Sequence, residues 1–101
     1  MNSRLKLHNI LVEILGSGNV YFQPPESITL KYPCIIYGRV GIDAVHADNK
    51  LYKHKTKYQI TVIDRNPDNK ILFDVLCIPL CRYNTHFNKD NLNHDIFTLF
   101  Y

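Results

Sequence analysis

The stretch over residues 53–69 (KHKTKYQITVIDRNPDN) most strongly limits what this chain can fold into. Every second residue from Tyr58 to Val62 is apolar and the residues between them are polar, which is the alternation of a β-strand. The residue types also suit a pleated, half-buried surface. The run stops in a cluster of turn formers, where Pro67 fixes φ and Asx side chains can bond to the nearby backbone. The sequence therefore predicts a long strand that ends sharply at Asp64.

Shorter patterns on both sides of this strand predict two helices. Apolar residues at helical spacing predict an amphipathic helix over about residues 5–15, which Gly16 and Gly18 would end. A second, short helix is expected over about residues 70–78, and Pro79 would end it.

The remaining patterns predict further strands around the long one. Residues 32–40 include an uninterrupted apolar run, which is typical of a strand covered on both faces. The simplest connection makes them the antiparallel partner of the long strand, with residues 41–50 as the loop between the two. A short strand near the sheet edge is expected at 19–23 and a last strand, apolar on both faces, at 94–101, while residues 81–87 fit either strand or coil.

The composition indicates one compact domain over residues 1–101, with a mainly antiparallel sheet, an N-terminal helix and one short second helix. The chain is 46% hydrophobic and 21% charged, as in an ordinary soluble globular protein. A domain of this size buries roughly 65% of the surface that its unfolded chain exposes. We therefore expect marginal stability unless a partner covers part of the remaining surface.

The charge and the first residues bear on partners and location. The formal net charge of +3 is mild, so acidic partners are possible and none is required. His8, Asn9 and Glu13 interrupt the apolar N-terminal stretch, which does not match an export signal. No segment approaches the roughly 20 apolar residues that span a bilayer. We expect a cytoplasmic origin and no membrane partner, and the odd number of cysteines fits reduced thiols.

The residues that come nearest to a metal site are Cys77 and Cys81, with His86 and His94 downstream. Their spacing matches neither of the paired patterns of structural zinc sites. Pro79 also breaks the helix that would place both thiols on one side. The alternative, that these thiols act as small buried hydrophobic groups, is favoured.

No set of catalytic residues is visible in the sequence. Cys34 lies in an apolar strand, where burial would raise the pKa of its thiol, so it is expected to be an inert core residue. The acidic residues mostly occupy turns, where Asx turns and helix caps explain them, and the glycines form no phosphate-binding loop. The sequence therefore predicts no enzyme, no cofactor and no metal.

A row of lysines is the most informative charged feature. Lys53, Lys55 and Lys57 are two residues apart and would share one face of a strand, which Gln59 and Thr61 continue without a bulky apolar group. The row could face an acidic partner subunit or the phosphates of passing DNA. The alternative is a solvated edge on which lysines prevent strand pairing.

The order of the segments suggests a known family. VYFQPPES follows the N-terminal helix and is followed by YPCIIYGRV, YQITVIDRNPD, a brief helical piece and LNHDIFTLFY. Together these motifs resemble the small tail-terminator or tail-completion proteins of long-tailed bacteriophages, over residues 5–101. The chain departs from them at its second helix, which is short and broken by Pro79, where relatives often carry a fuller helix.

The resemblance implies a non-enzymatic structural protein of the virion, assembled in the host cytoplasm, with an α+β fold in which helices flank a sheet. Such proteins assemble as a six-fold ring on the last ring of the tail-tube protein, stop tube growth and present a surface for joining the head. Lys53, Lys55 and Lys57 would then line the lumen of the ring, where DNA passes, or its tube-facing side.

The same resemblance implies contacts to adjacent rings from the turn at 65–69, with Arg65 and Asp68, and from the loop at 41–49. Two alternatives remain. One is a head-closure protein or other neck connector. The other is a small nucleic-acid-binding accessory protein that uses the lysine row.

Overall fold

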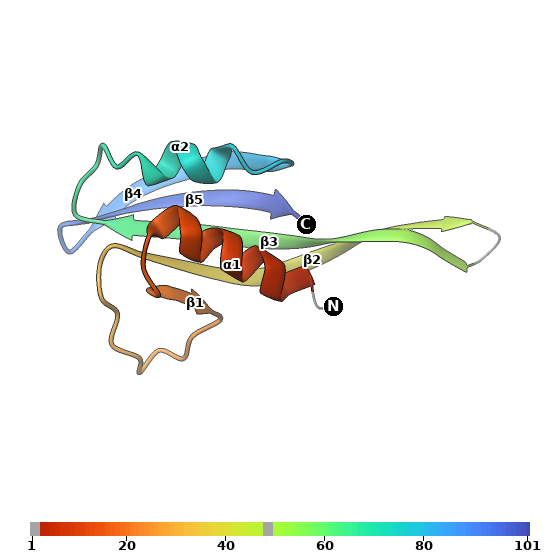
Figure 1. Cartoon of the computed structure of the whole chain (residues 1–101), viewed down its shortest axis with the longest axis horizontal. Helices are drawn as coiled ribbons and strands as arrows, with labels where there is room; N and C mark the ends of the chain where they lie inside the picture. The colour runs from red at the N-terminus through yellow and green to blue at the C-terminus, as the bar shows by residue number, and fades with distance from the viewer. Residues whose placement is uncertain (1–2, 48–49) are drawn as a thin grey trace.

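The chain folds into a five-stranded sheet with two helices on one of its faces (Figure 1), which confirms the predicted α+β class. The computed structural model describes residues 3–47 and 50–101, with side chains except at residues 3, 43, 45–47 and 50–54. In chain order the elements are α1 (Ser3–Leu15), β1 (Val20–Phe22), β2 (Cys34–Ala47), β3 (Lys50–Asp64), α2 (Ile71–Leu76), β4 (Cys81–Lys89) and β5 (Leu92–Phe100).

The long strand predicted from the alternation is β3, which lies in the middle of the sheet. The strand order is β1-β2-β3-β5-β4; β1 runs parallel to β2, and all other neighbours are antiparallel. The predicted pairing of β2 with β3 and the predicted end at Asp64 are both confirmed. Strand β1 lies at the edge, as expected from the two prolines that follow it.

The segment that fitted either strand or coil is strand β4, which forms a hairpin with β5. Asp90 and Asn91 connect the two strands with φ values of 55° and 61°. A two-residue hairpin turn with both φ values positive matches the right-handed twist of the strands, and Asp and Asn tolerate this conformation well. The local sequence thus fixes the register of the hairpin.

Helix α1 ends as the sequence predicts. Gly16 has a φ of +78°, and its N–H donates to the carbonyl of Val12 at 2.9 Å. This left-handed glycine satisfies a carbonyl of the last turn at no steric cost. Leu7 and Leu11 lie one helical turn apart and are fully buried against the sheet, and each contributes about 1.5–3 kcal/mol through burial.

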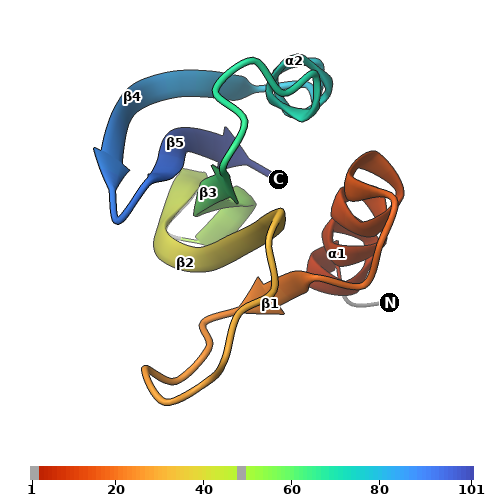
Figure 2. The same cartoon turned by 90° about the vertical axis from the view of Figure 1, so that its left-hand side faces the viewer.

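The core lies between the two helices and one face of the sheet. Figure 2 shows the strands nearly end-on, with both helices on the same side. The buried cluster combines side chains of α1, the α2 region and all five strands except β4: Leu7, Leu11, Val20, Ile35, Tyr37, Tyr58, Ile60, Val62, Ile71, Val75, Ile78, Phe97 and Leu99. The opposite face of the sheet, which no helix covers, is called the open face below.

Strands β2 and β3 extend beyond the body as a two-stranded arm, formed by residues 40–47 and 50–55 (Figure 1). Strand β1 pairs with β2 at residues 35–37, and β5 pairs with β3 at residues 57–64. Two further backbone hydrogen bonds join Thr56 to Tyr101, just after β5. The arm contributes to the elongated shape of the molecule, which measures 51 × 24 × 23 Å.

The arm corrects the prediction of a loop over residues 41–50. The pairing continues from Gly41 opposite Lys57 to Ala47 opposite Lys50, so most of this segment is strand; residues 48 and 49 lie outside the described part of the chain. The extra residue in the ladder at this point is Val40, which forms a bulge. Gly41 therefore follows a local irregularity in the strand and does not end it.

The last strand differs from the prediction on its buried face. Phe97 and Leu99 are fully buried as expected, but Asn93 and Asp95 occupy the same face and are 7% and 5% exposed. The residues between them are half-buried on the open face. Strand β5 is thus apolar on the inside at one end and polar at the other.

Candidate partner-binding surfaces

The predicted lysine row lies on the open face, at the base of the arm. The ladder of β3 is regular from Lys53 to Lys57, so alternate residues share a face as predicted. Lys55 is exposed, Lys57 is half-buried, and Gln59 and Thr61 follow on the same face. The backbone of Lys53 is in register with this row, but its side chain lies outside the described part of the chain.

The last strand holds Lys57 in place. Its backbone pairs with Phe100, and its Nζ lies 6.0 Å from the centroid of the Phe100 ring. An ammonium group at this distance from a ring gains roughly 0.5–1 kcal/mol at an exposed site. Lys57 therefore belongs to the body, while Lys55 stands on the arm.

The other two predicted contact residues, Arg65 and Asp68, lie at the opposite end of β3 and are exposed. Two hydrogen bonds hold their turn: Asn66 Oδ1 accepts the N–H of Asp68 at 3.0 Å, and the Asn93 side-chain amide donates to the carbonyl of Arg65 at 3.1 Å. Eight residues of strand separate Lys57 from Arg65, which is about 26 Å. The structure therefore does not bring the lysine row and this turn together.

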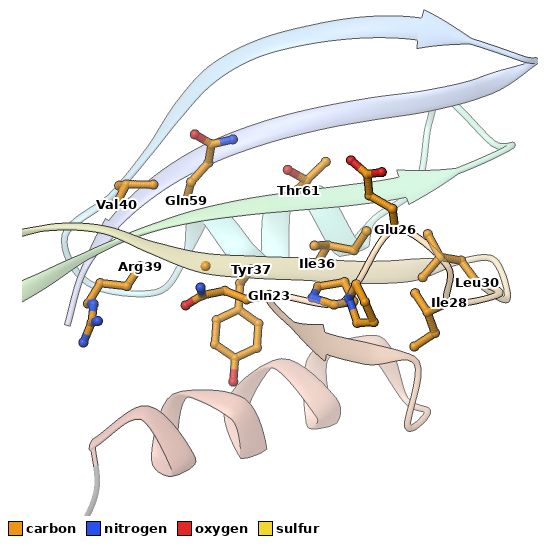
Figure 3. A pocket seen from close by; sticks show the side chains of 13 residues that line it. Gln23, Glu26, Ile28, Leu30, Ile36, Tyr37, Arg39, Val40, Gln59 and Thr61 are labelled. Carbon is orange, nitrogen blue, oxygen red and sulfur yellow. The ribbon is translucent and has the colours of Figure 1, made fainter.

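A hollow of about 470 Å³ lies on the open face between residues 23–30 and strands β2 and β3 (Figure 3). Gln59 and Thr61 point into it from β3, and Ile36 and Val40 flank them from β2. As predicted, no bulky apolar side chain interrupts the row at Gln59 and Thr61, but apolar groups of the neighbouring strand β2 lie beside it. The lysine row thus leads into a hollow with polar and apolar walls.

Sequence reasoning missed a second cavity, which lies on the helix-covered face between α2 and the β4–β5 hairpin. It has a volume of about 590 Å³ and is called the α2–β4 cleft below. Its walls are mainly apolar, and Phe73 of α2 is 68% exposed there. The lining residues are Pro67, Leu72, Phe73, Leu76, Tyr83, His86, Asp95 and Phe97.

The polar groups of the cleft come from facing positions of β4 and β5. The Tyr83 hydroxyl donates to Asp95 Oδ1 at 2.7 Å, and the Tyr83 ring meets Phe97 edge-on with 5.2 Å between centroids. His86 Nε2 lies 3.1 Å from Asn93 Oδ1. The pKa of Tyr83 is raised to about 12. The largest cause is burial of the hydroxyl, and its hydrogen bond to the Asp95 carboxylate and the charge of that group add to it. The cleft is therefore a largely apolar space with a carboxylate in its wall.

One part of this cleft could have been found from the sequence. The period of two places Asp95 on the same face of the last strand as Phe97, so a carboxylate next to the core was predictable. The neighbourhood of Phe73 and Tyr83 was not, because it depends on where the second helix lies across the sheet. Arrangements of this kind carry no local signal.

The three cysteines are free, and they differ in exposure. Cys34 is fully buried, and burial together with the Asp64 carboxylate raises the pKa of its thiol to about 11, which confirms an inert core thiol. Cys81 is half-buried, and burial raises its thiol pKa as well. The expectation of a buried thiol is wrong for Cys77, which is exposed at the end of α2.

Two searches of the described residues found nothing. Among the side chains described over residues 3–47 and 50–101, no group of three or more His, Cys, Asp or Glu residues is placed to hold a metal ion. In the same part of the chain, no helix combines the length and the apolar character that crossing a membrane requires.

Comparisons with known proteins gave no match: no protein-family model fits the chain, and no curated protein or solved structure is significantly similar to it.

Proposed function

We propose that this chain is the subunit of a ring that caps the head-proximal end of a bacteriophage tail tube, stops its growth and presents the surface to which the head is joined. The sequence motifs that resemble tail-terminator proteins suggest this role. The structural observation that carries it is the arm, which exposes backbone edges and apolar side chains that contact with another subunit would bury.

The arm leaves groups unsatisfied that a neighbouring copy can cover. A two-stranded ribbon is only marginally stable in water. Beyond Thr56, which bonds to the backbone of Tyr101, the outer edges of β2 and β3 in the arm pair with no third strand in the described part of the chain. The side chains of Val40 and Ile42 are 55% and 58% exposed. In a closed ring, contacts between neighbouring copies would bury such surfaces in every subunit.

Six-fold symmetry and contact with the tail-tube protein come from the resemblance alone and form part of the proposal. The lysine row would then face the lumen or the tube. The turn with Arg65 and Asp68 lies at the opposite end of β3, where it could contact the next ring or a neck protein. A head-closure protein or other neck connector would use the same surfaces on a different neighbour.

The test is assembly with purified tail-tube subunits, followed by electron microscopy and native mass spectrometry. We expect rings of this protein at tube ends and shorter tubes than without it. Phage particles that lack the protein but carry tails of normal length joined to filled heads would contradict the proposal. A protein that forms no rings and instead shifts DNA with a steep dependence on salt would be the nucleic-acid-binding accessory.

An arm-shortened variant makes this test specific. Gly41 and Lys57 are direct partners in the ladder. The next pair involves Thr56, whose backbone bonds outward to Tyr101, so Gly41 and Lys57 are the pair that bonds to each other. Asn-Gly can therefore replace residues 42–56 and close a short hairpin. The buried cluster lies outside the deleted part, so the body should fold. We expect this variant to lose tube capping, while the surface variant Lys31→Ala, altered in an exposed loop, should keep it.

A further inference from the structure

The α2–β4 cleft has a buried carboxylate, Asp95, in its wall. Asp95 is 5% exposed, and the side-chain hydrogen bond that it accepts in the described part of the chain comes from the neutral hydroxyl of Tyr83. Removing a carboxylate from water costs several kcal/mol unless an opposite charge or several donors replace the water. A cation that binds Asp95 in the cleft would therefore gain more binding free energy than a cation that binds an exposed carboxylate.

The walls of the cleft restrict which cation fits. Phe73 and Leu76 line the cavity from α2, and the Tyr83 ring lines it from β4. A lysine side chain can lay its four-carbon stem along apolar walls and place its ammonium group at a carboxylate. An ammonium group near the face of an aromatic ring gains further electrostatic stabilisation. The cleft thus suits lysine side chains that are presented by another protein surface.

Such a surface occurs in this chain. Residues 39–57 contain five basic and two acidic residues, so the whole formal net charge of +3 lies in and next to the arm. Lys55 is exposed there, and Val40, 55% exposed, lies on the same face as the lysine row (Figure 3). The lysine face of the arm therefore offers both the cation and an apolar side chain.

The arm cannot serve the cleft of its own chain. It projects from one end of the elongated molecule, while α2 and the β4–β5 turn lie toward the other end (Figure 1). A contact between the two surfaces has to join different copies. Because the surfaces are different, the contact is head-to-tail, and head-to-tail contacts close into rings when the rotation between copies allows it.

We propose that the arm of one copy docks its lysine face on the α2–β4 cleft of the next copy, with the Lys55 ammonium group directed at Asp95. This inference rests on the proposed ring and specifies the contact between its subunits. The docked arm covers Phe73 and Leu76 and supplies a positive charge to the buried carboxylate.

Chemical cross-linking tests this contact, because Cys77 is exposed and directly follows Leu76, which lines the cleft. A mixture of ¹⁵N-labelled and unlabelled protein is assembled with tail-tube subunits and treated with a short reagent that joins an amine to a thiol. We expect mixed-isotope cross-links from Lys53, Lys55 or Lys57 to Cys77. Assembled rings whose cross-links between copies lie elsewhere would overturn the docking and leave the ring intact.

Charge variants give an independent readout of the same contact. Lys55→Glu alters an exposed arm residue and Asp95→Asn keeps the shape of the carboxylate, so we expect each to weaken self-association about tenfold or more. Lys89→Glu, an exposed residue on β4 outside the cleft lining, is the matched control and should associate normally. Equal association of Lys55→Glu and wild type would overturn the docking.

The two proposals fail in different ways. Dimers cross-linked from arm to cleft without any capping of tubes would support the docking and contradict the proposed function. Protein that stays monomeric in the presence of tail-tube subunits would contradict both.

Discussion

Removing the hydroxyl of Tyr83 tests whether Asp95 is a buried carboxylate that depends on one donor. Hydrogen bonds to charged groups contribute about 1.5–3 kcal/mol, and a buried acceptor that loses its donor retains its desolvation cost. The hydrogen bond of 2.7 Å is short and charge-assisted. The Tyr83 side chain is 47% exposed, so water can partly replace the lost donor. We therefore expect Tyr83→Phe to lower the free energy of unfolding by about 1–2 kcal/mol.

Urea denaturation of the protein without tail-tube subunits measures this loss. The control is Tyr32→Phe, which removes a hydroxyl from a side chain that is 37% exposed in the loop before β2. That change should stay within about 0.5 kcal/mol of wild type, as surface substitutions usually do. If Tyr83→Phe is as stable as this control, the carboxylate of Asp95 does not depend on the hydroxyl, and the account of the cleft is wrong.

The titration of Tyr83 provides a second readout that a purely structural effect would not reproduce. Burial is the largest cause of the Tyr83 pKa of about 12, and the hydrogen bond to Asp95 and the charge of that group are the others. Asp95→Asn removes the charge, so the pKa of Tyr83 should fall toward 10, and burial should keep it above that value. Ultraviolet absorbance of tyrosinate follows the change, and an unchanged pKa in Asp95→Asn would show that the carboxylate is not a cause.

Three further predictions concern the stability of the body. Leu11→Ala removes a fully buried side chain and should cost about 2–5 kcal/mol in urea denaturation, while Leu5→Ala, 49% exposed on the same helix, should cost far less. Asn69→Ala should cost about 1–2 kcal/mol, because the Asn69 Oδ1 accepts the N–H of Ile71 at 2.9 Å and its side-chain amide donates to the Asp64 carboxylate; circular dichroism during urea denaturation checks this, and a neutral effect would contradict the role of these hydrogen bonds. The thiol pKa of Cys34 is raised from 9.0 to about 11, so the neutral thiol stabilises the folded state fully below pH 9, and this stabilisation is lost as the pH rises through 11. The free energy of unfolding should fall by up to about 3 kcal/mol over this range. An equally steep fall in the free energy of unfolding of Cys34→Val would refute this.

The elements that the sequence predicts correctly are those whose signals lie in neighbouring residues. Helix α1, strand β3 and the short helix α2 depend on periodicities and on stop signals such as Gly16 and Pro79, which lie within a few residues of the element that they end. The pairing of β2 with β3 follows from the short route between them. In each case the information is contained in neighbouring residues.

The arm shows where this reasoning fails. Residues 41–47 contain a glycine, an aspartate and two alanines, which are poor strand formers, and their composition favoured a loop. Their conformation is set by the partner strand: β3 pairs with them from Lys57 to Lys50, and the ladder passes the bulge at Val40 and a second irregularity between Val45 and His46. Propensity in strands depends on what lies across the ladder, and this information comes from a different part of the chain.

The charges of the arm have opposite effects inside one copy and between copies. Residues 39–57 carry a net charge of +3, although Asp43 lies directly opposite Lys55 in the ladder. The excess positive charge repels itself, so the free arm should be less stable at low ionic strength, and salt should favour its ladder by screening that repulsion. A contact between these lysines and the carboxylate of a neighbouring copy has the reverse dependence, since salt weakens attraction between unlike charges. An acidic partner surface therefore compensates a cost that the isolated chain bears, which gives Lys55 a reason to be on the projecting arm and not on the body.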